Sequence, residues 1–158
     1  MDGENIKVRM AEYGIGSSPD KIVTIGLGSC LGITLFDPRK KLGGMVHIML
    51  PENKKNLKPA KYADTGLPLL VEEMEKKGAS RRRFEAKIAG GASMFSVSEN
   101  SSLDVGRRNI KKVESVLDDL NIDILGKDVG ENFGRTMEFY TSTGEVIITS
   151  HQRDELSL

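Results

Sequence analysis

Apolar and polar residues alternate along much of the first fifty positions, in short runs separated by turn-forming residues. Alternation with a period of two is typical of strands that bury one face. Residues 14–20 are rich in glycine, serine and proline and predict a break between strands. Asp37-Pro38, followed by two basic residues, predicts a tight turn. The pattern as a whole predicts strands at residues 6–10, 22–25, 31–36 and 42–50.

The last three of these runs are short and closely spaced, which favours an antiparallel meander. In such a sheet, consecutive strands turn back beside one another. From a turn centred near residue 38 or 39, Cys30 and His47 are each about eight residues away, one on either strand. The meander therefore predicts that Cys30 and His47 lie at the same end of the sheet.

After Pro59 the spacing of the apolar residues changes to that of a helix. Four residues follow at spacings of four, three and four and define one apolar stripe: Ala63, Leu67, Leu70 and Met74. Pro59 suits the first position of a helix, and Gly78 suits its end. Pro68 lies inside the pattern, and we expect it to kink the helix or to restart it.

The rest of the chain predicts further elements of both kinds. We expect a strand at 83–88, a loop at 93–104, a strand at 122–128, and a closing hairpin of 136–140 and 145–149. A second helix is predicted from four residues at helical spacing: Ile110, Val113, Leu117 and Leu120. The tail from His151 is charged and is expected to be loose. Without a recognisable linker or repeat, residues 1–158 are interpreted as one domain.

The composition favours a globular protein of ordinary size. Of the 158 residues, 38% are apolar and 29% charged, and the 23 basic and 23 acidic residues cancel. This balance argues against a nucleic-acid partner. No apolar run approaches the roughly 18 residues of a membrane helix, and the polar N-terminus is unlike a signal peptide, so we expect no direct membrane insertion. The single cysteine favours the reducing cytoplasm.

Cys30 is the only cysteine, and it ends the glycine-rich run Gly26-Leu27-Gly28-Ser29-Cys30. A single thiol can form neither an internal disulfide nor a cysteine-rich metal cage. Within the predicted folded body the one candidate base for this thiol is His47, because the second histidine, His151, lies in the tail. A thiol among small residues with one candidate base indicates cysteine nucleophile chemistry. The alternative is that Cys30 is a small buried apolar residue and that His47 is an ordinary core residue.

Neighbouring residues suit acyl transfer. Thr24 lies on the strand before the glycine run, and its hydroxyl is expected to orient the imidazole of His47, although threonine is also common in strands generally. Gly26 and Gly28 permit close backbone approach, so this loop, together with Ser29, is predicted to direct N–H groups at an oxyanion. A thiol beside an imidazolium is expected to have a lowered pKa.

Two phosphate chemistries are excluded. A cysteine phosphatase requires an arginine about six positions after its cysteine to clamp the phosphate, and that position holds Phe36. The chain contains no Walker-type Gly-Lys-Ser/Thr sequence, so nucleotide phosphate binding is unsupported. Peptide, ester and side-chain amide substrates all remain open on the residues alone.

Five ordered blocks stand out between about residues 6 and 149: TIGLGSC at 24–30, HIMLP at 47–51, KYADT at 61–65, KIAGGASMF at 87–95 and GRRN at 106–109. Together they closely resemble the CheD family, the chemoreceptor glutamine deamidases of bacterial and archaeal chemotaxis. The resemblance implies an α+β fold with β-sandwich-like sheets and two main helices packed outside. It also implies a hydrolase that needs no cofactor and no metal.

The resemblance further assigns roles and partners. It implies that Cys30 is the nucleophile, His47 the base and Thr24 the third member of the site. The implied reaction hydrolyses selected glutamine side chains of methyl-accepting chemotaxis receptors through a thioester, giving glutamate and ammonia. A second implied partner is a CheC-type phosphatase, which the protein would bind and stimulate.

The chain departs from the family pattern at two places. The late motif usually reads Asp-x-Gly-Gly and here reads Asp128-Val129-Gly130-Glu131, and Pro68 interrupts a helix that is normally smooth. Two other functions stay open: a non-catalytic adaptor that only binds the phosphatase or receptor, and an amidase acting on a small molecule.

A receptor substrate also makes a demand on the shape of the site. A glutamine on a rod-like helical surface requires a shallow groove around Cys30. We expect one wall of this groove to consist of Gly90, Gly91, Met94 and Phe95, because the glycines allow close approach and the other two offer adaptable apolar contact. The alternative for Met94 and Phe95 is a place in the core.

Overall fold

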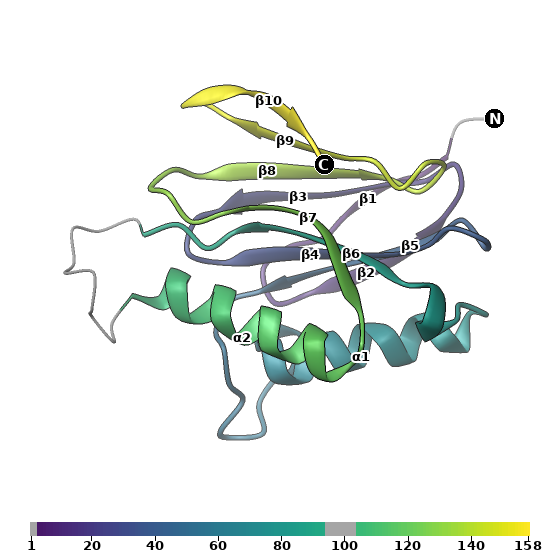
Figure 1. Ribbon diagram of the computed structural model, residues 1–158, viewed down its shortest axis with the longest axis horizontal. Helices are drawn as coiled ribbons and strands as arrows, with labels where there is room; N and C mark the ends of the chain where they lie inside the picture. The colour runs from purple at the N-terminus through teal and green to yellow at the C-terminus, as the bar shows by residue number, and fades with distance from the viewer. Residues whose placement is uncertain (1–2, 94–103) are drawn as a thin grey trace.

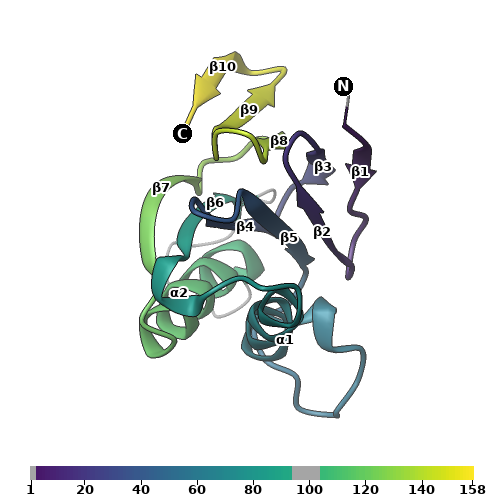
Figure 2. The ribbon, with the colours of Figure 1, turned by 90° about the vertical axis from the view of Figure 1, so that its right-hand side faces the viewer.

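The computed structural model describes residues 3–93 and 104–158 and consists of three layers (Figure 1). Two β-sheets stack on one another, and two long helices lie against the outer face of one of them. The view turned by 90° shows the two helices side by side below the sheets (Figure 2). The arrangement is an α+β fold, which confirms the fold class expected from the resemblance.

Each sheet has five strands in the described part of the chain. The β3 sheet has the order β1-β3-β8-β9-β10, with β1 at Asn5–Lys7, β3 at Lys21–Leu27, β8 at Arg135–Tyr140, β9 at Val146–Ser150 and β10 at Arg153–Ser157. The β4 sheet has the order β2-β5-β4-β6-β7, with β2 at Tyr13–Ser17, β4 at Leu31–Asp37, β5 at Leu42–Ile48, β6 at Glu85–Gly90 and β7 at Asp123–Val129. The pairs β1–β3 and β6–β7 are parallel, and the others are antiparallel.

Both long helices pack on the β4 sheet. A 3₁₀ turn, η1, at Pro59–Lys61 leads into α1 at Ala63–Lys76, and a second, η2, at Arg81–Arg83 precedes β6. The helix α2, at Val105–Asp119, begins where the Asp104 side chain accepts a hydrogen bond from the backbone N–H of Arg107. No helix in the described ranges is both long enough and apolar enough to cross a membrane.

The helix α1 runs through Pro68 as one element, so of the two expected outcomes, a kink or a restart, the restart does not occur. A proline inside a helix removes one backbone hydrogen bond and costs roughly 3 kcal/mol. The apolar stripe of α1 is fully buried against the β4 sheet and α2, including Leu67, Leu70 and Met74. Tertiary burial of these three side chains outweighs the local cost of the proline.

Alternate residues of β4 serve two separate cores. Leu31, Ile33 and Leu35 pack between the β4 sheet and the helices, whereas Phe36 joins the core between the two sheets, as does Cys30 just before the strand. Both faces of β4 are buried, and its two polar side chains, Thr34 and Asp37, are buried as well. The central strand of the β4 sheet therefore contributes to both layers of packing.

The N-terminal strands differ from the sequence-based prediction in three ways, the first being that the strand expected at 6–10 ends at Lys7. Residues 13–17 form β2 instead of a break, and the absence of side chains at Gly14 and Gly16 leaves space that Ile6 fills. The run at 22–25 belongs to β3, in the other sheet, so the predicted three-strand meander reduces to the β4–β5 hairpin. Glycine content alone misled the prediction, because here the glycines serve close packing and not a turn.

The C-terminal residues also form regular structure. Residues 153–157 make β10, which pairs with β9, and the Leu158 N–H donates to the Val146 carbonyl at 2.7 Å. Most of β10 is exposed. An exposed charged strand at a sheet edge has little hydrophobic signal, which explains why the sequence suggested a loose tail.

Candidate active site

The three candidate residues come from elements of both sheets and from the link that crosses between them. Thr24 lies on β3, Cys30 lies in the link from β3 to β4, and His47 lies on β5. In the β4–β5 ladder, Gly32 pairs with His47 and Leu31 pairs with Ile48. This register confirms that Cys30 and His47 lie at the same end of the hairpin.

The two side chains also share a face of the β4 sheet. Cys30 packs in the core between the sheets, and the neighbouring Leu31 packs on the helix side. The imidazole of His47 reaches Thr24 of the opposite sheet. Gly32, between them, has no side chain, and the space a Cβ would take is filled, because that atom would lie 2.8 Å from the sulfur of Met137 and 3.3 Å from the Thr24 methyl group.

Thr24 fixes the proton positions of His47. The Thr24 hydroxyl lies 2.6 Å from the Val8 carbonyl oxygen and 2.7 Å from His47 Nδ1. A carbonyl can only accept, so the single hydroxyl hydrogen of Thr24 goes to Val8. The Thr24 oxygen must then accept from Nδ1–H. This assignment leaves Nε2 of His47 without a hydrogen and with a lone pair, the form required of a base.

The free nitrogen of His47 is enclosed by protein. His47 is fully buried, and its Nε2 has no hydrogen-bond partner among the described residues. Burial lowers the pKa of the imidazole to about 4, because it penalises the cationic form. The histidine is therefore neutral at physiological pH.

The thiol has the opposite character from the one expected. Burial raises the pKa of Cys30, and the Cys30 backbone N–H offsets this only in part. The expectation of a lowered thiol pKa beside an imidazolium is wrong for this structure, because the neighbouring histidine is neutral and the sulfur is desolvated. The resting pair consists of a thiol and a neutral imidazole.

The loop before Cys30 is held by its carbonyl groups. The Gly28 carbonyl accepts from the Ala92 N–H at 2.8 Å, and the Ser29 carbonyl accepts from the side-chain amide of Asn109 at 2.9 Å. In a trans peptide the C=O and N–H point in opposite directions. The N–H groups of Ser29 and Cys30 therefore point away from Ala92 and Asn109. Gly26 has a φ of +78° and lies at a register shift of β3, in keeping with its predicted backbone freedom.

Asn109 is a residue that sequence reasoning missed. It is fully buried on α2, and its amide nitrogen donates to Ser29 and also to the Met49 carbonyl at 3.0 Å. A signal was present in the sequence. Asn109 lies four residues before Val113 on the apolar face of α2, and a polar side chain on such a face must find buried partners.

Gly90 and Gly91 lie inside the protein, behind the Cys30 loop. A Cβ on Gly90 would fall 2.2 Å from the Cys30 carbonyl oxygen, and the Gly91 N–H donates to the same oxygen at 2.9 Å. Both glycines are buried and have positive φ. Their position favours support of the loop over an exposed groove wall. Met94 and Phe95 lie outside the described residues.

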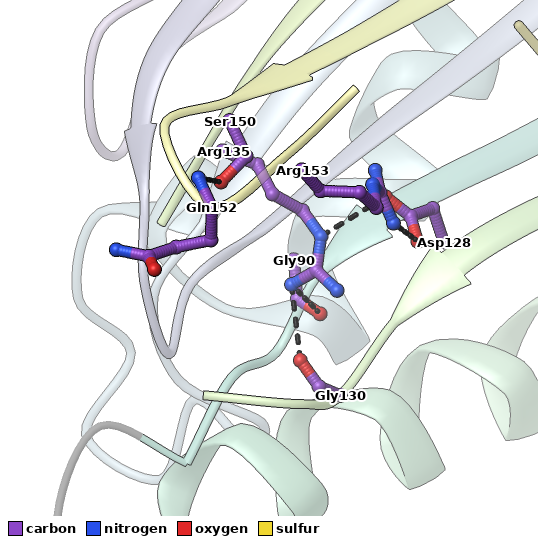
Figure 3. Close-up of polar contacts among 7 residues, drawn as sticks. All are labelled: Gly90, Asp128, Gly130, Arg135, Ser150, Gln152 and Arg153. Carbon is purple, nitrogen blue, oxygen red and sulfur yellow. Dashed lines mark hydrogen bonds and ion pairs between the residues drawn. The ribbon is translucent and has the colours of Figure 1, made fainter. Parts of the chain in front are cut away.

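A charged cluster holds the carbonyl groups of Gly90 and Gly130 (Figure 3). The buried Arg135 side chain donates to the carbonyls of Gly130, at 3.0 Å, and Gly90, at 3.5 Å. Its Nε donates to Asp128, which also receives two hydrogen bonds from Arg153. Burial alone would raise the pKa of Asp128, but the two guanidinium groups outweigh it and hold the pKa below its usual value.

Glu131, which stands where the family motif Asp-x-Gly-Gly usually has its last glycine, also affects the backbone. Glu131 occupies a left-handed backbone conformation with φ of +61°, which glycine adopts more easily. Its carbonyl accepts from the Ser93 N–H at 2.9 Å, so the strained turn helps to hold the segment that follows Gly91.

The fold is α+β, and the side chains gathered at the sheet crossing are of the types that cysteine hydrolases use. The family model described as "CheD chemotactic sensory transduction" matches residues 49–150. A Clostridium botulinum protein (strain Hall) named "Probable chemoreceptor glutamine deamidase CheD" is 51% identical over 152 residues, which cover 94% of each chain. A Clostridium novyi protein of the same name is 47% identical over the same length and coverage. The chain belongs to the CheD family.

Proposed function

We propose that this protein is a protein-glutamine deamidase that converts selected glutamine side chains of chemotaxis receptors to glutamate. The observation that carries the proposal is the hydrogen-bond chain from Val8 through Thr24 to His47 Nδ1, which leaves Nε2 free on the face shared with Cys30. The printed names of the related clostridial proteins support the same activity and substrate.

The reaction divides into acylation and hydrolysis. The Cys30 thiol gives its proton to His47 Nε2 as the sulfur attacks the amide carbon, forming a C–S bond and a tetrahedral oxyanion. The imidazolium then protonates the amide nitrogen, the C–N bond breaks, and ammonia leaves a thioester. Water, deprotonated by the same Nε2, attacks the thioester carbon. The C–S bond breaks, the proton returns to sulfur, and the product is glutamate.

The resting protonation states shape the first step. A raised thiol pKa and a lowered imidazole pKa disfavour a preformed thiolate–imidazolium pair. Proton transfer is therefore coupled to attack on the substrate, with His47 acting as a general base in the transition state. Such a site also limits reaction of the free thiol with oxidants and other electrophiles.

The oxyanion is stabilised by the backbone before the nucleophile. The N–H groups of Ser29 and Cys30 point away from the groups that hold their peptide carbonyls, which orients them as a pair of donors. Gly26, whose φ is +78°, supplies backbone freedom to this loop and makes no direct contribution to the oxyanion site. The groove wall was expected at Gly90, Gly91, Met94 and Phe95. The two glycines are buried, so we keep the proposal of an exposed wall only for Met94 and Phe95.

We assign the receptor's cytoplasmic helices as substrate, the cytoplasm as the location and a CheC-type phosphatase as a second partner. The single domain of residues 1–158 carries the whole site in this proposal. A non-catalytic adaptor would not require the ordered Thr24–His47 pair. An amidase for small molecules would act on free glutamine and not on receptor fragments, so the two substrates separate these functions.

The decisive experiment compares substrates and one variant. Purified protein is incubated with receptor cytoplasmic fragments or with free glutamine, and products are followed by ammonia release and by peptide mass spectrometry. We expect the mass gain of amide-to-acid conversion at particular receptor glutamines, absent with Cys30→Ala. Turnover of free glutamine alone would identify a small-molecule amidase. Binding of receptor without turnover would identify an adaptor.

A further inference from the structure

Asn109 connects the two segments that carry the thiol and the base. One hydrogen of its amide goes to the Ser29 carbonyl, in the peptide bond whose nitrogen belongs to Cys30. The other goes to the Met49 carbonyl, two residues beyond His47. Both acceptors are carbonyls, so the orientation of the amide is fixed by chemistry: nitrogen must face them.

The sequence of α2 permits this reach. A Cβ on Gly106 would lie 2.4 Å from the Ala92 carbonyl oxygen, so only glycine lets the start of α2 approach this closely. Asn109 follows one turn later and is fully buried between the helix and the two segments. Its Oδ1 has no hydrogen-bond partner among the described residues, so both amide hydrogens are used while the oxygen is not.

We propose that Asn109 is a positioning residue that sets the Cys30 loop against the His47 strand and aims the Cys30 N–H at the oxyanion. The inference rests on the deamidase function proposed above. Asn109 acts through the backbone and does not touch the substrate. By holding the Ser29 carbonyl, it turns the Cys30 N–H in the opposite direction, and the hydrogen bond it donates polarises that peptide and strengthens the N–H as a donor.

The first test measures receptor-glutamine deamidation by Asn109→Ala. A donor that is misaimed at the oxyanion affects the transition state more than substrate binding. We therefore expect kcat to fall by roughly 10²-fold or more, with KM changed by less than about threefold. The matched control is Val113→Ala, which truncates a fully buried α2 side chain one turn further on. It should lower the melting temperature and leave kcat unchanged below that temperature.

A second variant covers the case in which Asn109→Ala does not fold. Asn109→Ser retains one short donor and less of the side chain, and it should show an intermediate loss of kcat. A folded variant of either kind with wild-type kcat would overturn the proposal. An equal loss of kcat in Val113→Ala would reduce Asn109 to a general contribution to stability.

The second test does not depend on deamidase activity. Alkylation of Cys30 by iodoacetamide is measured for the wild type, His47→Ala, Asn109→Ala and the double variant. If Asn109 acts by setting the thiol against the imidazole, its removal changes the alkylation rate in the wild type but has little further effect once His47 is gone. Fully additive effects would contradict the proposal. Because this cycle needs no receptor, it separates failure of the Asn109 inference from failure of the proposed deamidase function.

Discussion

The base and the nucleophile are held in place by different kinds of structure. His47 lies within a regular strand, with its backbone paired to Gly32 on one side and bonded to Ala11 and Glu12 on the other. Cys30 lies outside any strand, and its loop is held by separate tethers from α2 and from the segment after β6. The base is therefore placed by sheet register, and the nucleophile by contacts between residues distant in sequence.

Because the base and the nucleophile are held differently, a mutation disturbs the position of each in a different way. A register cannot shift by one residue without moving His47 to the other face of its sheet. A tethered loop can move by fractions of an ångström when one tether is lost, which costs rate without costing the fold. Variants on the two sides of the site should thus separate into those that remove a chemical group and those that misplace one.

The largest expected effect comes from removing the nucleophile. Cys30→Ala should abolish receptor deamidation, because no other thiol is present in the chain. The change is small and buried, so circular dichroism and the melting temperature should remain close to wild type. Ammonia release by folded Cys30→Ala protein would exclude the thioester mechanism.

The next effect tests the base side. Thr24→Val keeps the shape but removes the hydroxyl that bonds Val8 and His47. We expect kcat to fall by about 10²-fold, because the imidazole tautomer is no longer fixed, together with a loss of roughly 1–3 kcal/mol in stability from the unpaired buried groups. Thr24→Ser keeps the hydroxyl, so it is the matched control and should retain most of the wild-type kcat and most of the wild-type stability. Steady-state kinetics and urea unfolding measure these two effects. If Thr24→Val and Thr24→Ser have the same kcat and the same stability, the hydroxyl does not orient His47.

The strand that carries His47 could be predicted from the sequence, whereas the contacts that hold the Cys30 loop could not. The β4–β5 hairpin follows from a turn signal and residue counting, and it places Cys30 and His47 together correctly. Thr24 was found by residue type, yet it reaches His47 from the other sheet, which local periodicity cannot reveal. Asn109 contacts Ser29 across eighty positions of sequence, and no local pattern encodes such a contact.

The same limit applies to the ionisation of the site. Residue types suggested a thiolate–imidazolium pair, whereas burial sets both pKa values in the opposite direction. Burial of a link between two sheets depends on how the sheets stack. That stacking emerges from the whole set of strands and not from the run around Cys30.

The buried histidine makes a prediction about stability and pH. The pKa of His47 is lowered to about 4 in the folded protein, against 6.5 in the unfolded chain, so the unfolded state takes up a proton first as pH falls. The free energy of unfolding should be level above pH 6.5 and should decline between pH 6.5 and 4 by up to about 3 kcal/mol. His47→Gln should flatten this decline in urea unfolding curves. An unchanged slope in that variant would show that His47 is not the group responsible.

A separate carboxylate group acts in a lower pH range. Burial alone would raise the pKa of Asp37, but hydrogen bonds from Arg83 and from the backbone N–H groups of Ser80 and Lys40 outweigh it and lower the pKa to about 2. Its contribution to stability is present above pH 3.8 and is lost as pH falls toward 2. Asp37 begins to lose its contribution only at about pH 5, so the decline between about pH 6.5 and about pH 5 can be assigned to His47 without interference from Asp37.

The smallest expected effect concerns the bracing behind the nucleophile loop. Glu131 holds a φ of +61°, a conformation that costs a residue with a Cβ roughly 1–2 kcal/mol and that glycine adopts freely. Glu131→Gly should relieve this cost, although the unfolded chain gains entropy and the exposed charge near Arg153 is lost. Glu131→Ala removes the same charge and keeps the strain, so it is the matched control. We expect the free energy of unfolding of Glu131→Gly to exceed that of Glu131→Ala by about 1 kcal/mol, or roughly 2–4 °C in melting temperature. Deamidation should be unchanged in both variants. If the alanine variant is as stable as the glycine variant, the left-handed turn carries no strain, and the departure from Asp-x-Gly-Gly has no energetic cost to this fold.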